Sequence, residues 1–252
     1  MHQNIQEAIL DGATPKALGY TFPAEFAKQD ATWLSWPHKE ASWPGKLNSI
    51  FPSYVEFIKI LTLSQRVCIN VVDATMQATA TKMMEALKVD LSKVQFYVHP
   101  TNDAWCRDHG PSFLIRNNKE QPKAIVDWNI NAWGGKYPPY DLDDAIPTHI
   151  AKALDLPVFH PNIIMEGGSV DFNGAGTVLT SKCCLLNPNR NPHLSQDQIE
   201  RYLCNYYGVE QVLWVSEGIV GDDTDGHIDD TVRFVNEDTV VTVVETNKAS
   251  EN

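Results

Sequence analysis

The 252-residue sequence has few cysteines, few basic residues and no long apolar run. Its five cysteines are an odd number, so we expect reduced thiols, as in a cytoplasmic protein. None of them forms a Cys-x-x-Cys pair, so we expect no structural zinc site. Lys and Arg number 20 against 32 Asp and Glu. No apolar run approaches the roughly 20 residues that cross a bilayer, so no membrane partner is expected. The first seven residues also lack the basic and then apolar pattern of a leader peptide.

The composition is otherwise that of a folded globular protein, with 43% hydrophobic and 21% charged residues. The net charge of −12 argues against nucleic acid as a partner, because phosphate binding needs a basic face. An acidic protein suits a small cationic substrate instead. The length allows one large domain or two small ones, and the oligomeric state is left open, a homo-oligomer included.

Apolar periodicity and turn residues predict alternating strands and helices. A strand, a polar loop, a hairpin and a helix recur in this order. We expect strands at 31–37, 66–72, 94–98, 112–115, 124–128, near 158 or 163, and at 211–215. Hairpins are expected at 170–179 and 231–244, and helices at 50–61, 74–87, 144–154 and from the N-cap Ser195 to Tyr207, ended by Gly208. The polar loops fall at 102–110, 166–168 and 225–227.

The spacing of the polar loops indicates a repeat of about 60 residues. Asp108 and Glu166 are 58 positions apart, and Glu166 and His227 are 61 apart. In a closed ring of such units the loops would meet on one axis; the alternative is three unrelated turns. One more step from His227 would pass Asn252. We therefore expect a single domain over 1–252 that lacks its C-terminal unit or units.

The stretch from Gly221 to Val235 concentrates carboxylates around one histidine. His227 and Asp229 are two positions apart, so on an extended strand they would point to the same side. A histidine beside a carboxylate is a common acid/base arrangement. The alternative is an acidic surface loop that is solvated and has no catalytic function. A metal site is a third reading, but the spacing does not fit an EF-hand, whose twelve-residue loop ends in glutamate.

Seven blocks of the sequence carry a resemblance to a known family. They are Phe22-Pro-Ala-Glu25, Ala31-Thr-Trp-Leu-Ser-Trp-Pro-His38, Trp105-Cys-Arg-Asp-His-Gly-Pro111, Asn131-Ala-Trp-Gly-Gly135, Glu166-Gly-Gly-Ser169, Leu186-Asn-Pro-Asn-Arg-Asn191 and Thr224-Asp-Gly-His-Ile-Asp229. Together they resemble the agmatine deiminase family, which includes the Porphyromonas-type peptidylarginine deiminases. The resemblance runs from about residue 20 to the end of the chain.

The resemblance implies an α/β fold, the pentein propeller of pseudo-symmetric ββαβ units. It also implies hydrolysis of a guanidine to a urea with loss of ammonia, without metal or organic cofactor. Agmatine is the preferred substrate, giving N-carbamoylputrescine for putrescine and polyamine biosynthesis. Peptidyl arginine, giving citrulline, is the alternative within the class, and a non-catalytic guanidine-binding fragment is the alternative outside it.

Site residues follow from the matching motifs. Asp108 and Asp229 would hold the guanidinium nitrogens, since carboxylates match its donors. Glu166 would join them and help to orient His227, the general acid/base. Trp105 would pack on the flat cation or its alkyl tail. Two glycines, Gly167 and Gly168, would let the backbone pass close to the substrate.

The sequence departs from the family in its nucleophile. The family's cysteine follows a glycine-rich stretch near its C-terminus, and no such stretch occurs here. The five cysteines, Cys68, Cys106, Cys183, Cys184 and Cys204, read as small buried hydrophobes. Cys106 would point away from Asp108 on an extended segment. We therefore expect that the chain ending at Asn252 is inactive alone.

Overall fold

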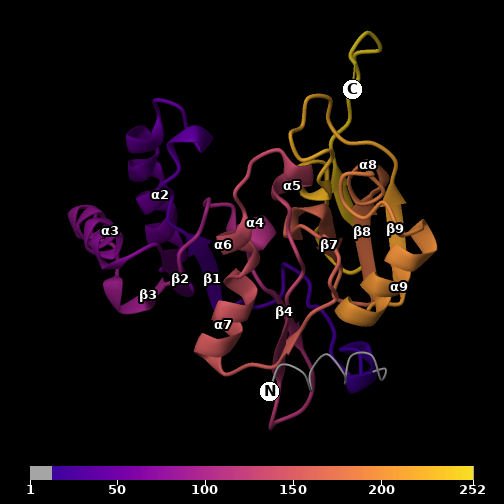
Figure 1. Ribbon diagram of the computed structural model, residues 1–252, viewed down its shortest axis with the longest axis horizontal. Coiled ribbons are helices and arrows are strands. Elements are labelled where there is room, and N and C mark those ends of the chain that lie inside the picture. Colours follow the sequence, from indigo (N-terminus) through magenta and orange to yellow (C-terminus); the bar gives the residue numbers. More distant parts are fainter. Residues whose placement is uncertain (1–12, 252) are drawn as a thin grey trace. The chain divides into compact units, whose positions relative to one another are not determined.

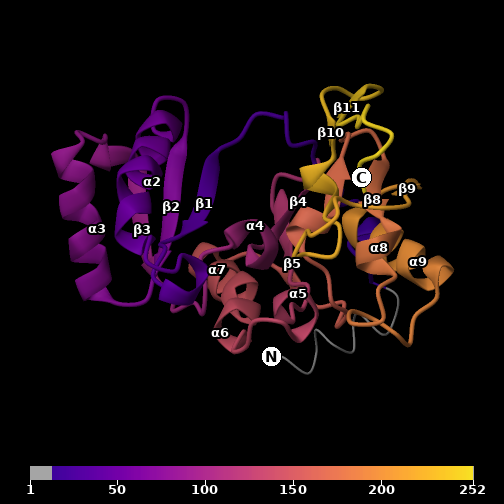
Figure 2. The same cartoon turned by 90° about the horizontal axis from the view of Figure 1, so that it is seen from above.

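The computed structural model describes residues 13–251, shown in two views in Figures 1 and 2. These residues fall into two compact units. The smaller unit comprises 28–110 and 139–146, and the larger unit comprises 13–27, 111–138 and 147–251. No helix in this part of the chain is long and apolar enough to cross a membrane. Residues 1–7, where we expected no leader peptide, lie outside the described part.

The smaller unit contains a parallel sheet with the strand order β1-β2-β3. The strands are β1 (Ala31–Ser35), β2 (Arg66–Val71) and β3 (Val94–Val98), and the connecting helices are α2 (Leu47–Leu61) and α3 (Ala74–Ala86). Val67, Ile69 and Val71 share one buried cluster with residues of both helices, so α2 and α3 cover the same face of the sheet (Figure 2). The nearly continuous apolar run of β2 suits this central, fully covered position.

The opposite face of this sheet carries buried polar side chains. Asn70 donates a hydrogen bond to Ser35 Oγ at 3.2 Å, and Ser35 Oγ lies 2.9 Å from His109 Nε2. His109 comes from α4 (Cys106–His109), a helical turn within the expected polar loop. Asp143, from α6 (Asp141–Asp144), accepts the backbone N–H of Asn102 at 2.7 Å. These contacts fix the loop that carries Asp108.

The larger unit contains two sheets of one topology. In the first, β4 (Ser112–Ile115) pairs antiparallel with β5 (Lys123–Val126), which pairs in parallel with β6 (Val158–Phe159). In the second, β7 (Val170–Phe172), β8 (Thr177–Ser181) and β9 (Gln211–Val215) repeat this pattern. Helix α7 (Ile146–Leu154) precedes β6, and α9 (Gln196–Tyr207) precedes β9. The expected order of strand, strand, helix and strand is therefore present twice.

A further antiparallel pair, β10 (Val232–Phe234) and β11 (Val240–Thr242), has the same place after its polar loop as β4–β5 and β7–β8. The first strands of the three pairs begin at Ser112, Val170 and Val232, which are 58 and 62 positions apart. The mixed α/β class is confirmed. Over the described residues the strands form four separate sheets and no closed one, and the ring arrangement stays a prediction.

One apolar core joins both sheets of the larger unit to α9. It includes Leu114, Val126, Val170, Phe172, Val178, Ile199 and Leu203. Ser195 and Gln198 form a capping box at the start of α9, and Gly208 ends it with φ +68°. A Cβ at Gly208 would lie 2.1 Å from the carbonyl oxygen of Tyr20, so only glycine fits there.

Several short helical turns were not expected from the sequence. They are η1 (Lys16–Leu18), η2 (Glu40–Ser42), η3 (Leu91–Lys93), η4 (Gly167–Ser169), η5 (Ile228–Asp230), α4, α5 (Ala132–Gly135) and α8 (Lys182–Leu185). The helix expected over 144–154 was also wrong in its start, because α6 ends at Asp144 and α7 begins at Ile146. Pro147 explains the break, since proline lacks the N–H that would continue α6.

Candidate active site

Glu166 and His227 occupy equivalent places in the larger unit. Each directly precedes a short 3₁₀ turn, η4 or η5, that leads into the first strand of an antiparallel pair. His227 is not on an extended strand, so the expectation that it and Asp229 project to one side by strand alternation was wrong. Asp229 lies within η5, where a helical turn replaces the alternation.

A turn closed by Asp222 holds His227 in place. Asp222 Oδ2 accepts the backbone N–H groups of Gly226 at 2.9 Å and of His227 at 3.2 Å, and Thr224 donates its hydroxyl to the same carboxylate at 2.7 Å. Burial opposes the charge of Asp222, but these hydrogen bonds outweigh it and lower the pKa of the carboxyl. The Asp222 carboxylate therefore fixes the conformation of the loop from Thr224 to His227.

A buried arginine holds Glu166. Arg190 Nε donates to Glu166 Oε1 at 2.7 Å, and Glu166 is only 1% exposed. Arg190 also donates from Nη1 to Asp225 Oδ2 at 2.7 Å and from Nη2 to the Thr224 carbonyl at 2.8 Å. One guanidinium thus connects Glu166 with the loop that leads to His227.

Electrostatics favour the charged form of this arginine. Burial alone would lower the pKa of Arg190, but the carboxylates of Glu166 and Asp225 more than offset this and raise it. Asp225 in turn has its pKa held near about 2, because hydrogen bonds from Lys136, Asn189 and Arg190 outweigh its burial. Arg190 and Asp225 are therefore both charged at neutral pH.

The structure brings Glu166, His227 and Cys184 together. Cys184 Sγ lies 3.9 Å from Glu166 Oε2, and one ligand atom from each of the three residues lies within 4.8 Å of the others. His227 is 3% exposed and Cys184 is fully buried. Cys184 belongs to α8, which begins at the N-cap Ser181. No role for this thiol was expected from the sequence, because a cysteine outside a recognisable motif usually only packs.

The other predicted site residues are described by their position and burial. Asp108 and Trp105 belong to the smaller unit, where Trp105 is 43% exposed and stacks on Trp43 with ring centroids 5.5 Å apart. Asp229 is half-buried, and Gly168 is buried. Gly167, beside it in η4, is half-buried. Their roles toward a substrate stay predictions.

The acidic residues before His227 do not converge as a metal site would require. Asp223 accepts a hydrogen bond from Tyr137, and Asp225 binds Lys136 at 2.7 Å in addition to Arg190. Asp222 closes its own turn. Each carboxylate thus has a different partner, which argues against the metal reading of this loop.

Burial makes most of the thiols weak acids. It raises the pKa of Cys106 to about 12 and also raises those of Cys68 and Cys204. Cys106 lies in α4, so the expected extended segment around it was wrong. Since the thiolate is the nucleophilic form, these three cysteines are poorly suited to attack.

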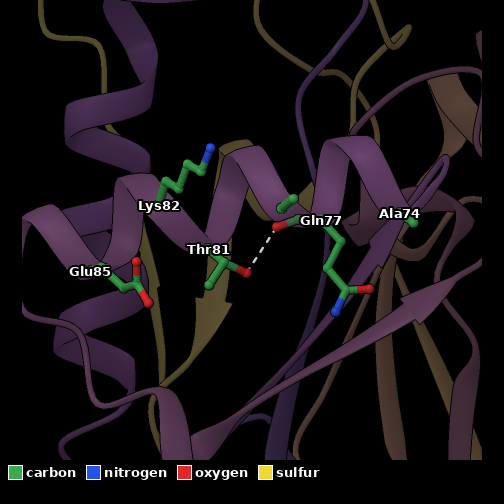
Figure 3. Close-up of a pocket in the computed structure, with 6 residues that line it drawn as sticks. Ala74, Gln77, Thr81, Lys82 and Glu85 are labelled. Atoms are coloured by element: carbon green, nitrogen blue, oxygen red, sulfur yellow. Dashed lines mark hydrogen bonds between the residues drawn. The ribbon is translucent and has the colours of Figure 1, made fainter.

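A hollow lies along α3 in the smaller unit, lined by Ala74, Gln77, Ala78, Thr81, Lys82 and Glu85. Figure 3 shows that the Lys82 and Glu85 side chains do not converge on a common point. Thr81 Oγ1 donates to the Gln77 carbonyl of its own helix at 2.8 Å. The hollow therefore lacks the group of converging polar side chains that Glu166, Cys184 and His227 provide.

Comparison with known proteins gives a consistent result. The sequence profile described as Porphyromonas-type peptidyl-arginine deiminase matches residues 21–252. A Legionella pneumophila (strain Paris) protein named "Putative agmatine deiminase" is 38% identical over 239 residues, which is 94% of this chain and 67% of that protein. A Yersinia pestis protein of the same name is 38% identical over 235 residues, 92% of this chain and 62% of that protein.

Solved structures agree with the sequences. Agmatine deiminase of Enterococcus faecalis superposes with a TM-score of 0.86 at 33% identity, over 95% of this chain and 64% of that one. A cysteine-to-serine variant of C. jejuni agmatine deiminase with substrate bound has a TM-score of 0.81 at 34% identity, over 92% of this chain and 67% of that one. The chain thus spans about two thirds of the length of these relatives.

Proposed function

Because the chain belongs to the Porphyromonas-type peptidyl-arginine deiminase family, we propose that it serves in the hydrolysis of a guanidine to a urea with release of ammonia. Agmatine is the proposed substrate, since relatives at 38% identity carry that activity in their names. N-carbamoylputrescine would be the product. A second hydrolysis, of its urea group, would yield putrescine, which places the reaction in polyamine synthesis.

The observation that carries this proposal is the buried Glu166 beside His227. We propose that His227 protonates the departing ammonia and then activates the water that releases the urea. Glu166 already binds the Arg190 guanidinium through Oε1 at 2.7 Å. This supports an orienting duty toward His227 over a direct grip on the substrate.

Substrate recognition is assigned to the other predicted residues. Asp229 and Asp108 would each accept hydrogen bonds from the guanidinium, and Trp105 would pack on its flat face. Gly167 and Gly168 would leave room for the backbone to approach. The pentein ring is proposed as the arrangement that brings these loops together, supported by the repeated strand order of the two sheets in the larger unit.

The reaction needs a thiolate, and its source stays a prediction. Cys68, Cys106 and Cys204 are disfavoured by their raised pKa values. Ammonia release from agmatine, measured on the purified chain and on a variant of each cysteine, tests the expectation that none of the five serves. Activity lost with one cysteine only would identify the nucleophile and contradict that expectation.

Binding tests the proposed substrate without requiring a nucleophile. Calorimetry should show agmatine binding and much weaker binding of putrescine, which has the same butyl chain but an amine in place of the guanidine. Asp229→Asn should lower the affinity for agmatine by about tenfold to a hundredfold, which is the contribution of one charge-assisted hydrogen bond. Asp223→Asn, in the same loop, is the matched control and should change little.

The alternative substrate is examined with the same chain. Benzoyl-arginine amide stands for peptidyl arginine. Tighter binding of this compound than of agmatine would favour the peptidylarginine reading. Equal binding of agmatine and putrescine would contradict guanidine recognition altogether.

A further inference from the structure

The geometry points to a zinc-binding site formed by Glu166, Cys184 and His227. Their ligand atoms, one from each residue, lie within 4.8 Å of one another, and all three residues are buried. A carboxylate, a thiol and an imidazole are the three ligand types that proteins use for Zn²⁺. Three protein ligands with a fourth position for water is the usual arrangement of an open zinc site.

The distances require only a small contraction. A tetrahedral ion with bonds of about 2.0–2.3 Å spaces its ligands about 3.3–3.8 Å apart. The Cys184 Sγ to Glu166 Oε2 distance is already 3.9 Å. The remaining pairs lie within 4.8 Å and need to close by at most about 1.5 Å, which side-chain rotation supplies.

The surroundings already orient all three ligands. Arg190 holds Glu166 through Oε1, which leaves Oε2 on the side of the thiol. The Asp222 turn holds the backbone of His227, and Ser181 caps the helix that carries Cys184. Outer partners of this kind raise metal affinity by fixing ligand orientation.

The ligand charges suit a divalent ion. Glu166 and a Cys184 thiolate together carry two negative charges. Arg190 keeps Asp225 as a second partner at 2.7 Å, and Asp225 is shared with Lys136.

A zinc ion on the His227 ring would remove that nitrogen from proton transfer, so zinc would inhibit. This consequence depends on the proposed function, whereas the binding itself does not. The two are therefore measured separately.

Binding is tested on the whole chain without substrate, with ZnCl₂ in calorimetry and CoCl₂ in absorption. We expect one Zn²⁺ per chain and, with Co²⁺, a thiolate charge-transfer band in the near ultraviolet. Cys184→Ser should abolish the band and lower the affinity for zinc by at least about tenfold. Cys183→Ser, the neighbouring thiol outside the set, is the matched control and should keep both.

Other outcomes overturn the site. They are no zinc binding at micromolar concentration, an unchanged affinity in Cys184→Ser, or loss of the band in Cys183→Ser. His227→Gln provides a second variant should Cys184→Ser fail to fold, and its zinc affinity should fall equally. In an active preparation, agmatine turnover that bound zinc leaves unchanged would overturn the inhibitory consequence.

Discussion

Arg190 Nε donates to Glu166 Oε1 at 2.7 Å, and both side chains are almost wholly buried. Removal of one partner would leave the other charge buried and uncompensated, which typically costs about 3–5 kcal/mol. Arg190→Met should therefore lower the free energy of unfolding by that amount in urea denaturation. Lys59→Met breaks an exposed pair with Glu56 and should cost under about 1 kcal/mol. A loss that small for Arg190→Met would contradict the buried-charge argument.

Gly226 is expected to tolerate alanine far less than Gly221 does. Both have positive φ, +99° and +82°, which costs a residue with a Cβ about 1–2 kcal/mol. At Gly226 a Cβ would also lie 2.2 Å from Cys183 Sγ, whereas nothing lies within 4 Å of one at Gly221. Urea denaturation of both alanine variants should show the larger loss at Gly226. Adding Cys183→Ala to Gly226→Ala should restore the part of the stability that is lost to the clash with Cys183 Sγ. If no stability is restored, the loss comes from the backbone conformation alone.

Acid should destabilise the smaller unit through His109. Burial lowers the pKa of His109 to about 3, so the folded imidazole stays neutral while the unfolded one takes up a proton below about pH 6.5. Stability is therefore present above pH 6.5 and is lost as pH falls toward 3, by about 1.4 kcal/mol per pH unit.

His109→Gln should remove this loss, so that stability in urea denaturation falls less, or rises, as pH is lowered from about 6 to 4, with a change in slope of up to about 1.4 kcal/mol per pH unit. Asp143, whose Oδ2 lies 3.8 Å from His109 Nδ1, acts with the opposite sign because burial raises its pKa to about 6, and it offsets part of the His109 loss in the wild-type protein. His149→Gln, at an exposed position, should keep the wild-type slope. An unchanged slope in His109→Gln would contradict the buried neutral histidine.

His227→Ala should lower kcat by about 10² to 10⁴ in an active preparation, the usual contribution of general acid–base catalysis. Glu166→Gln should lower kcat more than it raises KM, because Glu166 acts through the histidine. His149→Ala is the control for loss of a histidine as such. A fall below threefold with the fold intact would return His227 to a packing role.

Strand β11 is expected to promote self-association. In β11, Val240 and Val241 are 43% and 59% exposed, and Val243 and Val244 directly after it are 62% and 77% exposed. In the described residues β10 is the strand paired with β11. An exposed apolar edge strand is a template for pairing with another chain. Val241→Glu, directly opposite Arg233, should reduce light scattering at high concentration. Leu63→Glu changes an exposed apolar residue outside any strand and should leave the scattering unchanged.

Local signals account for the elements that were predicted well. Asn173-Gly174 at the hairpin turn and the Ser195–Gln198 capping box specify their structure within a few residues, and both are present. Turns of three or four residues, such as η5 and α8, are too short to show a period. For this reason the sequence pattern around His227 favours a strand, and it does not indicate the helical turn that carries Cys184.

The site was predictable only in part for a different reason. Repeat spacing suggested that Glu166 and His227 occupy equivalent loops, and both do precede short turns before a hairpin. The Arg190 partner is 24 positions from Glu166 and follows no period. The sequence hint for this partner is that Arg190 stands between Asn189 and Asn191. Amide side chains on both sides favour an arginine held by hydrogen bonds over a solvated one.

Residues 20–22, near the start of the described part of the larger unit, contact residues 207 and 208, which are synthesised much later. The Phe22 N–H donates to the Tyr207 carbonyl at 2.8 Å, and Gly208 closes on Tyr20. A ribosome that adds 5–20 residues per second needs roughly 10–40 s to cover that interval. During this time residues 28–110 emerge with nearly all of the smaller unit. Before residues 207 and 208 emerge, Thr21 can already pair with Ile115 and Tyr20 can donate to the Gln121 carbonyl, so the contacts with Tyr207 and Gly208 complete the packing of this segment late in synthesis.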